Sequence, residues 1–180
     1  MDTQEKQTKP KVWTLDKAHA KVGFGITHML VSEIDGSFKN FDVKLNVPNE
    51  DFSGAEIEFT ADVNSIDTAN EMRDNHLKNQ DFFHAEKNPK VTFKSKSFVK
   101  VADKKYALNG DLTFNGVTKN IDLDVKGNVV EHPMKPGTSI AGFKVTGEVK
   151  RSDFNFGPGF PTLALSNEVS ITANAEFTAE

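Results

Sequence analysis

The chain has 180 residues, no cysteine, and 26 acidic against 22 basic side chains, for a net charge of -4. This length fits one domain with a single core, and the acidic balance disfavours nucleic acid as a partner. The absence of thiols excludes disulfides, thiolate nucleophiles and cysteine-ligated metal sites.

The first element is a polar stretch over residues 1–12, which predicts a flexible N-terminal arm ahead of one domain at 13–180. The arm lacks the apolar segment of a secretion signal, and no later apolar run reaches the roughly 18 residues of a membrane-spanning helix. We therefore expect no direct membrane insertion. A cytoplasmic location stays open on these grounds.

Alternation of apolar and polar residues predicts eight long strands. In the first strand, Ala20, Val22, Phe24, Ile26 and His28 share one face. The expected strands cover residues 20–29, 41–47, 55–63, 91–101, 106–114, 117–125, 141–149 and 169–177.

Two irregularities in this pattern carry local predictions. Phe98 breaks the phase that Val91, Val99 and Val101 share, which indicates a bulge. Asn115-Gly116 between two strands predicts a two-residue hairpin turn, because both residues accept a positive φ.

The stretch over residues 68–83 does not alternate like a strand. Thr68-Ala69-Asn70-Glu71 fits a capping box, in which the Thr hydroxyl and the Glu carboxylate bond to free backbone N–H groups. The apolar residues that follow indicate a short amphipathic helix. Because this excursion interrupts a series of strands, we expect it to cover one mouth of the fold.

Strands that are apolar on one side only must hide that side. Closing the sheet on itself does so and removes exposed edges, which predicts an all-β, extended eight-stranded antiparallel barrel. A two-sheet sandwich is the competing architecture. The 15 Phe residues beside one Trp and one Tyr bring apolar area with few polar atoms, so the interior suits a hydrocarbon guest. An interior filled by its own side chains explains the same alternation.

The polar residues of the excursion match no familiar catalytic or metal-binding pattern. His76 and His84 are eight residues apart, which is not the spacing that places two imidazoles on one helical face. A nucleophile motif of the G-x-S-x-G type is missing. Arg73 and Asp74 are adjacent on a helix and point in different directions, so stabilising nearby loops is their simplest role. We predict no metal, no covalent cofactor and no enzymatic activity, with a lipid-related hydrolase at the barrel mouth as the alternative.

Several motifs along the chain resemble those of a known family. They are W-x-x-D-x-x-H at Trp13, Asp16 and His19, F-x-I-x-H-M at Phe24 to Met29, Gly36-Ser37-Phe38, S-I-x-T-x-N at Ser65 to Asn70, Arg73-Asp74, His76-Leu77, Asp81-Phe82-Phe83, G-D-L-T-F-N-G-V-T-K at Gly110 to Lys119, and Arg151-Ser152-Asp153-Phe154. Over residues 13–178 the chain resembles the YceI-like family of bacterial lipocalin-like, polyisoprenoid-binding proteins. Asn155, where the family commonly has Gly, is a departure in one loop.

The resemblance implies a lipocalin-like barrel whose bore holds a long-chain amphiphilic lipid. The implied ligand is a polyisoprenoid or isoprenoid quinone, or a fatty-acid derivative, bound for transport, storage or sensing. The resemblance also implies a location in the periplasm or cell envelope, often as a homodimer. A solid barrel that acts through protein partners is the alternative.

We expect the inward faces of the strands and the excursion to contact the lipid. The ligand-binding candidates are Val22, Phe24, Ile26, His28, Phe41, Val43, Phe59, Met72, Leu77, Phe82, Phe83, Phe93, Leu112, Phe114, Phe143, Val145 and Ile171. The candidates for the rim or for contact with a head group are Arg73, Asp74 and His76.

Overall fold

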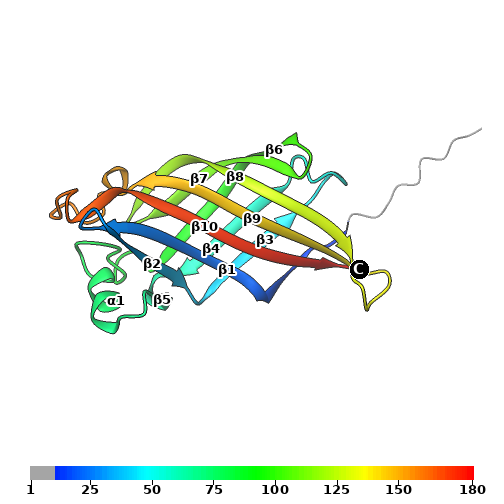
Figure 1. Cartoon of the computed structure of the whole chain (residues 1–180). Helices are drawn as coiled ribbons and strands as arrows, with labels where there is room; N and C mark the ends of the chain where they lie inside the picture. The colour runs from blue at the N-terminus through cyan, green and yellow to red at the C-terminus, as the bar shows by residue number, and fades with distance from the viewer. Residues whose placement is uncertain (1–10) are drawn as a thin grey trace, which may run out of the picture.

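A computed structural model describes residues 11–180 as one antiparallel sheet that curls strongly on itself (Figure 1). The strands are β1 (Thr14–His28), β2 (Ser32–Phe38), β3 (Phe41–Asn46), β4 (Glu56–Asp62), β5 (Ile66–Asp67), β6 (Lys90–Ala102), β7 (Lys105–Phe114), β8 (Val117–Glu131), β9 (Ser139–Lys150) and β10 (Leu165–Ala179). Their order in the sheet is β3-β4-β6-β7-β8-β9-β10-β1-β2-β5. One helix, α1 (Glu71–Leu77), and two 3-10 turns, η1 (Val63–Ser65) and η2 (Arg151–Phe154), complete the described elements. The all-β class is confirmed, while the predicted arm lies, apart from residues 11 and 12, outside the described residues.

The sheet has ten strands, not the eight predicted. The two additional strands are β2 and the two-residue β5, which pair with each other. The alternation in β2 is interrupted by Gly36, which is buried opposite Phe24 of β1. A Cβ at Gly36 would collide with the ring of Phe24, so an aromatic side chain from the neighbouring strand supplies the apolar group at this position. The alternation of apolar and polar residues within β2 therefore gives too few buried positions for this strand.

The sheet does not close through a continuous ladder, so the predicted closed barrel is wrong. β1 pairs with β2 only from Gly23 to His28, and residues 14–22 have no ladder partner on that side within the described chain. β3 lies beside this part of β1, and a single bridge, Trp13–Leu45, joins them. The fold is a half-barrel, and we call the junction between residues 14–22 and β3 the seam.

The predicted Asn-Gly hairpin is confirmed. Asn115 and Gly116 have φ values of 50° and 71°, and they connect Phe114 to Val117, which face each other across β7 and β8. Positive φ at both central residues is the geometry of a type I′ turn, whose twist matches that of the flanking strands.

The predicted bulge in β6 is confirmed, with a consequence for the side chains beyond it. The register with β7 shifts between Ser95 and Ser97. Phe98 therefore points into the core, where it is 5 % exposed, whereas Val99 and Val101 face outward and are exposed. The shared inward phase expected for these two valines is wrong, because the bulge reverses the alternation after it.

The helix is shorter than the predicted excursion, and a different residue caps it. The side chain of Asn70 accepts a hydrogen bond from the Arg73 backbone N–H at 2.9 Å. Thr68 instead donates to the Asp74 carboxylate, from its N–H at 2.8 Å and its hydroxyl at 2.6 Å. Ala69 has a φ of 61°, so the chain turns sharply after Thr68 and removes it from the capping position. Within residues 11–180, no helix is long and apolar enough to cross a membrane.

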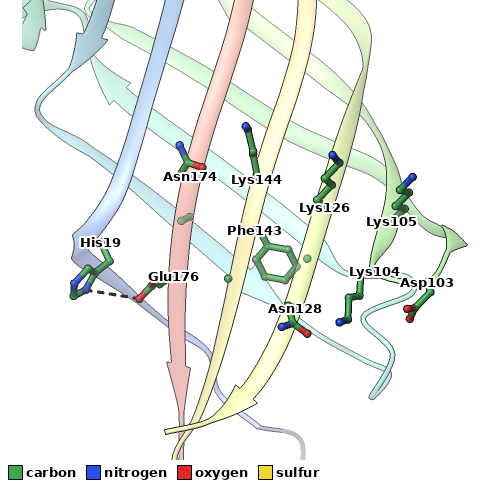
Figure 2. A pocket seen from close by; sticks show the side chains of 13 residues that line it. His19, Asp103, Lys104, Lys105, Lys126, Asn128, Phe143, Lys144, Asn174 and Glu176 are labelled. Atoms are coloured by element: carbon green, nitrogen blue, oxygen red, sulfur yellow. Dashed lines mark ion pairs between the residues drawn. The ribbon is translucent and has the colours of Figure 1, made fainter. Parts of the chain in front are cut away.

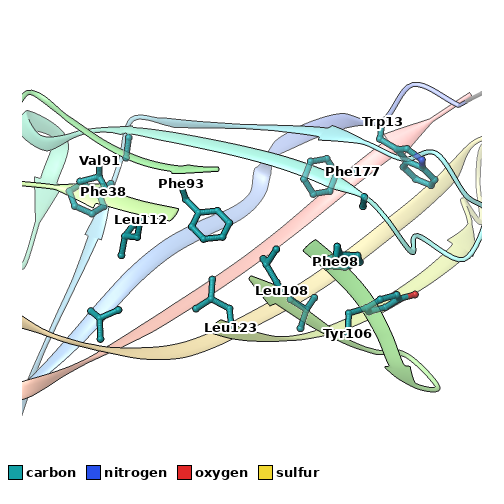
Figure 3. Packing of buried hydrophobic residues seen from close by; sticks show 14 of the residues in the cluster. Trp13, Phe38, Val91, Phe93, Phe98, Tyr106, Leu108, Leu112, Leu123 and Phe177 are labelled. Atoms are coloured by element: carbon teal, nitrogen blue, oxygen red, sulfur yellow. The ribbon is translucent and has the colours of Figure 1, made fainter. Parts of the chain in front are cut away.

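Aromatic side chains pack at both ends of the curled sheet. The helix-side cluster, beside α1 and the loop that follows η2, consists of Phe38, Phe82, Phe83, Phe114, Phe154, Phe156 and Phe160. The Trp13 cluster at the other end consists of Trp13, Phe52, Phe98, Tyr106, Phe143 and Phe177. Figure 3 shows Trp13, Phe98, Tyr106 and Phe177 of this cluster. Ring centroids are as close as 4.0 Å in the first cluster and 4.7 Å in the second. Both ends of the bore are thus filled by tightly packed rings.

A buried cation fixes the loop over the helix-side end. Arg151 is 5 % exposed. Its guanidinium donates at 2.7 to 3.3 Å to the backbone carbonyl oxygens of Phe156, Gly157, Phe160, Leu165 and Ser166. Backbone dipoles therefore replace the water that the charge loses on burial, and the loop between η2 and β10 is anchored across the end of the bore.

Candidate functional site

An apolar cavity of about 150 Å³ lies in the bore between the two aromatic clusters. Of the predicted ligand contacts, its wall includes Val22, Val43, Phe59, Phe93, Leu112, Phe143, Val145 and Ile171. The rest of the wall is formed by Leu45, Ile57, Phe98, Leu108, Ile121, Leu123, Val125, Ala173, Ala175 and Phe177. Every lining side chain is apolar, and the backbone polar groups of the wall are already bonded in ladders. This space therefore suits a hydrocarbon and offers no hydrogen-bond partner to a polar guest.

Apart from Phe98, which the bulge in β6 turns inward, the wall residues absent from the predicted set follow the same alternation. Leu45 follows Val43 on β3, and Leu123 follows Ile121 on β8, each on the inward face. Alternation identifies the face of a strand. It does not give the depth at which each residue meets the cavity, because that depends on the stagger between strands.

A second group of predicted contacts fills the helix-side end. Phe82, Phe83 and Phe114 belong to the helix-side cluster, and Leu77 packs against the core beside them. Phe24 also lies here, with its ring 5.9 Å from that of Phe38. The excursion therefore closes this end by packing into it, and the expected mouth at residues 72–83 is not open.

A third group lies away from the cavity. Met72 is 83 % exposed on the outer side of α1, and His28 is exposed at the end of β1. Ile26 is half-buried and does not line the cavity, and Phe41 lines a separate recess described below. The roles of all these residues as lipid contacts stay predictions.

Arg73 and Asp74 both form hydrogen bonds with Thr68, which is 5 % exposed. Arg73 donates from Nε to the Thr68 hydroxyl at 2.8 Å and from Nη2 to the Thr68 carbonyl at 2.7 Å. His76 lies at the surface, with its ring 5.0 Å from that of Phe82 and Nε2 3.9 Å from the Asp81 carboxylate. The contacts of Arg73 and Asp74 stabilise the loop before α1, which is the simplest role that the sequence predicts for them, whereas His76 contacts residues that follow α1. Their proposed contact with a head group stays a prediction.

The seam contains a second recess of about 320 Å³, which we call the side cleft. Its lining residues are Lys17, Ala20, Lys21, Ser37, Phe38, Lys39, Asn40 and Phe41, which include three lysines and no carboxylate. Ala20 and Phe41 precede the cavity-lining Val22 and Val43 by two residues on the same strand faces. The apolar floor of the side cleft therefore leads toward the wall of the cavity.

The W-x-x-D-x-x-H residues shape β1 at the seam. The register with β10 shifts between Asp16 and Ala20, so residues 17–19 form a bulge. Asp16 accepts hydrogen bonds from the Ala18 N–H at 3.1 Å and from His19 Nδ1 at 2.8 Å. The bulge places Lys17 at the side cleft.

The bulge also brings His19 between two carboxylates. Its Nδ1 lies 2.8 Å from Asp16 and 3.7 Å from Glu176. The hydrogen bond with Asp16 raises the pKa of His19 above its ordinary value of 6.5 and lowers the pKa of Asp16 below 3.8. Together they are a group of three potential metal ligands within residues 11–180. A protonated imidazole shared between two carboxylates accounts for the same geometry.

The outer face of the sheet carries a shallow recess of about 560 Å³, which is lined by lysines and by the carboxylates of Asp103 and Glu176 (Figure 2). Lys105, Lys126 and Lys144 occupy directly opposed positions on β7, β8 and β9. The same row continues through Asn174 on β10 to Lys21 on β1. Within the described chain none of these four lysines forms an ion pair. The sequence does not reveal this row, because the lysines lie on separate strands.

The matches to known proteins span most of the described chain. Residues 13–177 match the YceI-like domain. A UPF0312 protein of Staphylococcus aureus is 38% identical over 170 residues, which are 92% of this chain and 96% of that protein. The Campylobacter jejuni YCEI protein, 36% identical, has a similar structure with a TM-score of 0.76 over 91% of this chain and 95% of that one. A polyisoprenoid binding domain from Saccharophagus degradans shares the fold at a TM-score of 0.65 and 15% identity, over 94% and 99% of the two chains.

Proposed function

The chain belongs to the YceI-like domain family, and from that premise we propose that its bore binds the tail of a long-chain amphiphilic lipid. The lipid class is a polyisoprenoid or isoprenoid quinone, or a fatty-acid derivative. The observation that carries the proposal is the cavity between the aromatic clusters, whose lining is apolar on every strand that reaches it. Such a space gains free energy when a hydrocarbon occupies it, because dispersion contacts are missing on its empty side.

The Saccharophagus degradans domain supports the choice of ligand class, since it is named for binding polyisoprenoid and has the same fold. A tail held by dispersion and hydrophobic burial needs no reactive group. Each methylene transferred from water contributes about 0.8 kcal/mol, so about ten of them give roughly 8 kcal/mol before the cost of ordering the tail.

The size of the cavity limits how the lipid is held. A volume of about 150 Å³ is smaller than the roughly 300 to 1,000 Å³ of common ligand pockets. A long tail must therefore displace aromatic side chains within the bore or extend beyond it into the side cleft. We expect both, and we expect the rings of the Trp13 cluster to change rotamer on binding.

The proposal is tested by extraction of the purified protein. The full chain, expressed in two hosts with different isoprenoids, is extracted with organic solvent and analysed by mass spectrometry. We expect about one long-chain lipid per protein, or stoichiometric uptake of added isoprenoid quinone where the extract is empty. Empty extracts from both hosts together with no uptake of quinone would overturn the proposal.

Two further expectations accompany lipid binding. We propose a location in the periplasm or cell envelope, to be checked by cell fractionation with antibody detection. We also propose a homodimer, to be checked by light scattering over a range of concentrations.

The rate at which the protein transfers its lipid to acceptor vesicles distinguishes a carrier from a protein that stores or senses the lipid. Transfer is fast only for a carrier.

A further inference from the structure

Both ends of the bore are filled by side chains, and its wall has one weakly bonded junction. The helix-side cluster is held in place by the contacts of Arg151, and in the Trp13 cluster Trp13 is 9% and Phe52 4% exposed. Every neighbouring pair of strands from β3 round to β2 is hydrogen-bonded. A guest that enters without breaking a ladder or unpacking a cluster must therefore pass between β1 and β3.

The seam has the features of an opening. One bridge, Trp13–Leu45, joins its two sides, and no ladder connects residues 14–22 with β3 in the part of the chain that the structure describes. Residues 41–45 at about 3.3 Å each give the seam a length of roughly 16 Å. The bulge held by Asp16 and His19 interrupts the edge of β1 at this place.

We propose that the side cleft is the portal through which the lipid enters, and that its lysines bind an anionic head group. This inference rests on the proposed function. The tail would pass over Ala20 and Phe41 directly to Val22 and Val43 of the cavity. The head group, a phosphate or carboxylate, would stay at the surface.

The charges at the side cleft favour an anion. Lys17 and Lys21 have no ion-pair partner among residues 11–180, whereas Lys39 is paired with Asp67 at 3.1 Å. No carboxylate lines the cleft, although the chain as a whole has a net charge of -4. Lysine side chains can lay their methylenes along a tail and direct the ammonium group to an oxyanion.

The outer row of lysines adds to this local field. It runs across β7, β8 and β9 and reaches the cleft at Lys21. Closely spaced charges of one sign raise the local concentration of an oppositely charged ligand. An anionic amphiphile would therefore meet a row of ammonium groups that ends at the portal, while Asp103 and Glu176 are the carboxylates of the neighbouring recess.

The head-group site is tested with two probes that share one tail. A fluorescent C18 fatty acid and its methyl ester are titrated into the full chain at low salt. We expect the acid to bind about fivefold more tightly than the ester, because two exposed charge pairs contribute modestly. The double variant Lys17→Ala/Lys21→Ala should lose this preference. Lys119→Ala, which removes an exposed lysine on β8, three strands away from β1 in the sheet, should keep it.

The route of entry is tested by blocking the cleft. Because the chain has no cysteine, Ala20→Cys can be labelled there with a bulky aromatic group through a mixed disulfide. Labelled protein should take up the ester about tenfold more slowly in stopped-flow measurements, since the tail must wait for a rarer opening. Removal of the label with reductant should restore the rate in the same sample. The matched control is labelled Thr146→Cys, on the outer face of β9.

The outcomes separate this inference from the proposed function. Equal affinity of acid and ester for the native chain would overturn the head-group site, and unchanged uptake by labelled Ala20→Cys would overturn the portal. Absence of saturable binding of either probe would instead contradict lipid binding itself. If labelled Ala20→Cys unfolds at a lower temperature than the control, labelled Lys17→Cys, on the rim, replaces it in the same comparison.

Discussion

The helix-side end of the bore and the seam differ in how their polar groups are satisfied. At the helix-side end, Arg151 bonds to five carbonyl oxygens, and Thr68 is held by both Arg73 and Asp74. At the seam, two strand edges share one bridge, and the lysines beside them have few partners. Regions with few backbone bonds open at lower free-energy cost than well-bonded ones. This fold therefore keeps its helix-side end rigid and has its weakest junction on its side, at the seam.

The largest effect is expected from breaking the rigid end. Arg151→Ala leaves buried carbonyl oxygens without a donor and should lower the free energy of unfolding by about 3 to 5 kcal/mol. Denaturant unfolding measures the loss. Arg151→Lys should recover only part of it, because an ammonium group has three donors and no planar fork. A loss below about 1 kcal/mol, or an equal loss in Lys150→Ala next to it, would contradict the anchoring role.

A smaller loss is expected at the second anchor of the same end. Thr68→Val keeps the shape of the side chain but removes the hydroxyl between Arg73 and Asp74. We expect the free energy of unfolding to fall by about 1 to 3 kcal/mol, because the half-buried Asp74 carboxylate loses one of its two donors and the Arg73 Nε loses its acceptor. Thr60→Val, exposed on β4, serves as the control in the same denaturant series. Equal denaturant midpoints for the two variants would argue against a stabilising role of the hydrogen bonds between Thr68, Arg73 and Asp74.

A change of opposite sign, a gain in stability, is expected in the row of lysines on the outer face of the sheet. Lys126→Glu places an acid between Lys105 and Lys144, where directly opposed like charges now repel. Opposite charges across strands contribute about 0.2 to 1 kcal/mol, so the variant should be more stable at low salt by a value in that range. The gain should shrink at 1 M salt, because screening weakens exposed charge pairs. A gain that does not change with salt would point to a different cause.

The smallest effect concerns the bulge at the seam. The hydrogen bond between them raises the pKa of His19 and lowers the pKa of Asp16, so this pair stabilises the fold fully between the ordinary values of 3.8 and 6.5. The contribution is lost as pH rises through the raised pKa of His19 or falls through the lowered pKa of Asp16. The exposure of His19 makes the contribution slight. NMR titration should place the pKa of His19 above 6.5 in the native chain and nearer to 6.5 in Asp16→Asn. The same pKa in both proteins would show that the pair does not hold the bulge.

The sequence predicts the strands better than it predicts the openings of the bore. Alternation located the eight long strands and the inward faces of Val43, Phe93 and Ile171. It missed β2, where Gly36 is covered by the ring of Phe24. Strand number and curvature also depend on where ladders stop, and a bulge such as that after Asp16 leaves only a weak trace in the sequence.

The candidate site shows the same limit. Phe82 and Phe83 are apolar and lie between strands, a pattern that predicts a hydrophobic opening of the bore. Whether such rings line an opening or fill it depends on the loop that Arg151 anchors above them. Lys17, Lys21 and Lys39 look like ordinary surface lysines in the sequence. They meet only because β1 bulges and β2 leads directly into β3.

The central claim is that the bore holds a lipid tail. Val145 points into the cavity and Thr146, its neighbour on β9, points outward, so Val145→Phe and Thr146→Phe add similar bulk to opposite faces. Titration of a fluorescent C18 methyl ester should give one saturable site in the native chain and in Thr146→Phe, and at least about tenfold weaker binding in Val145→Phe. Equal affinity of the two variants, at unchanged thermal stability, would contradict the claim.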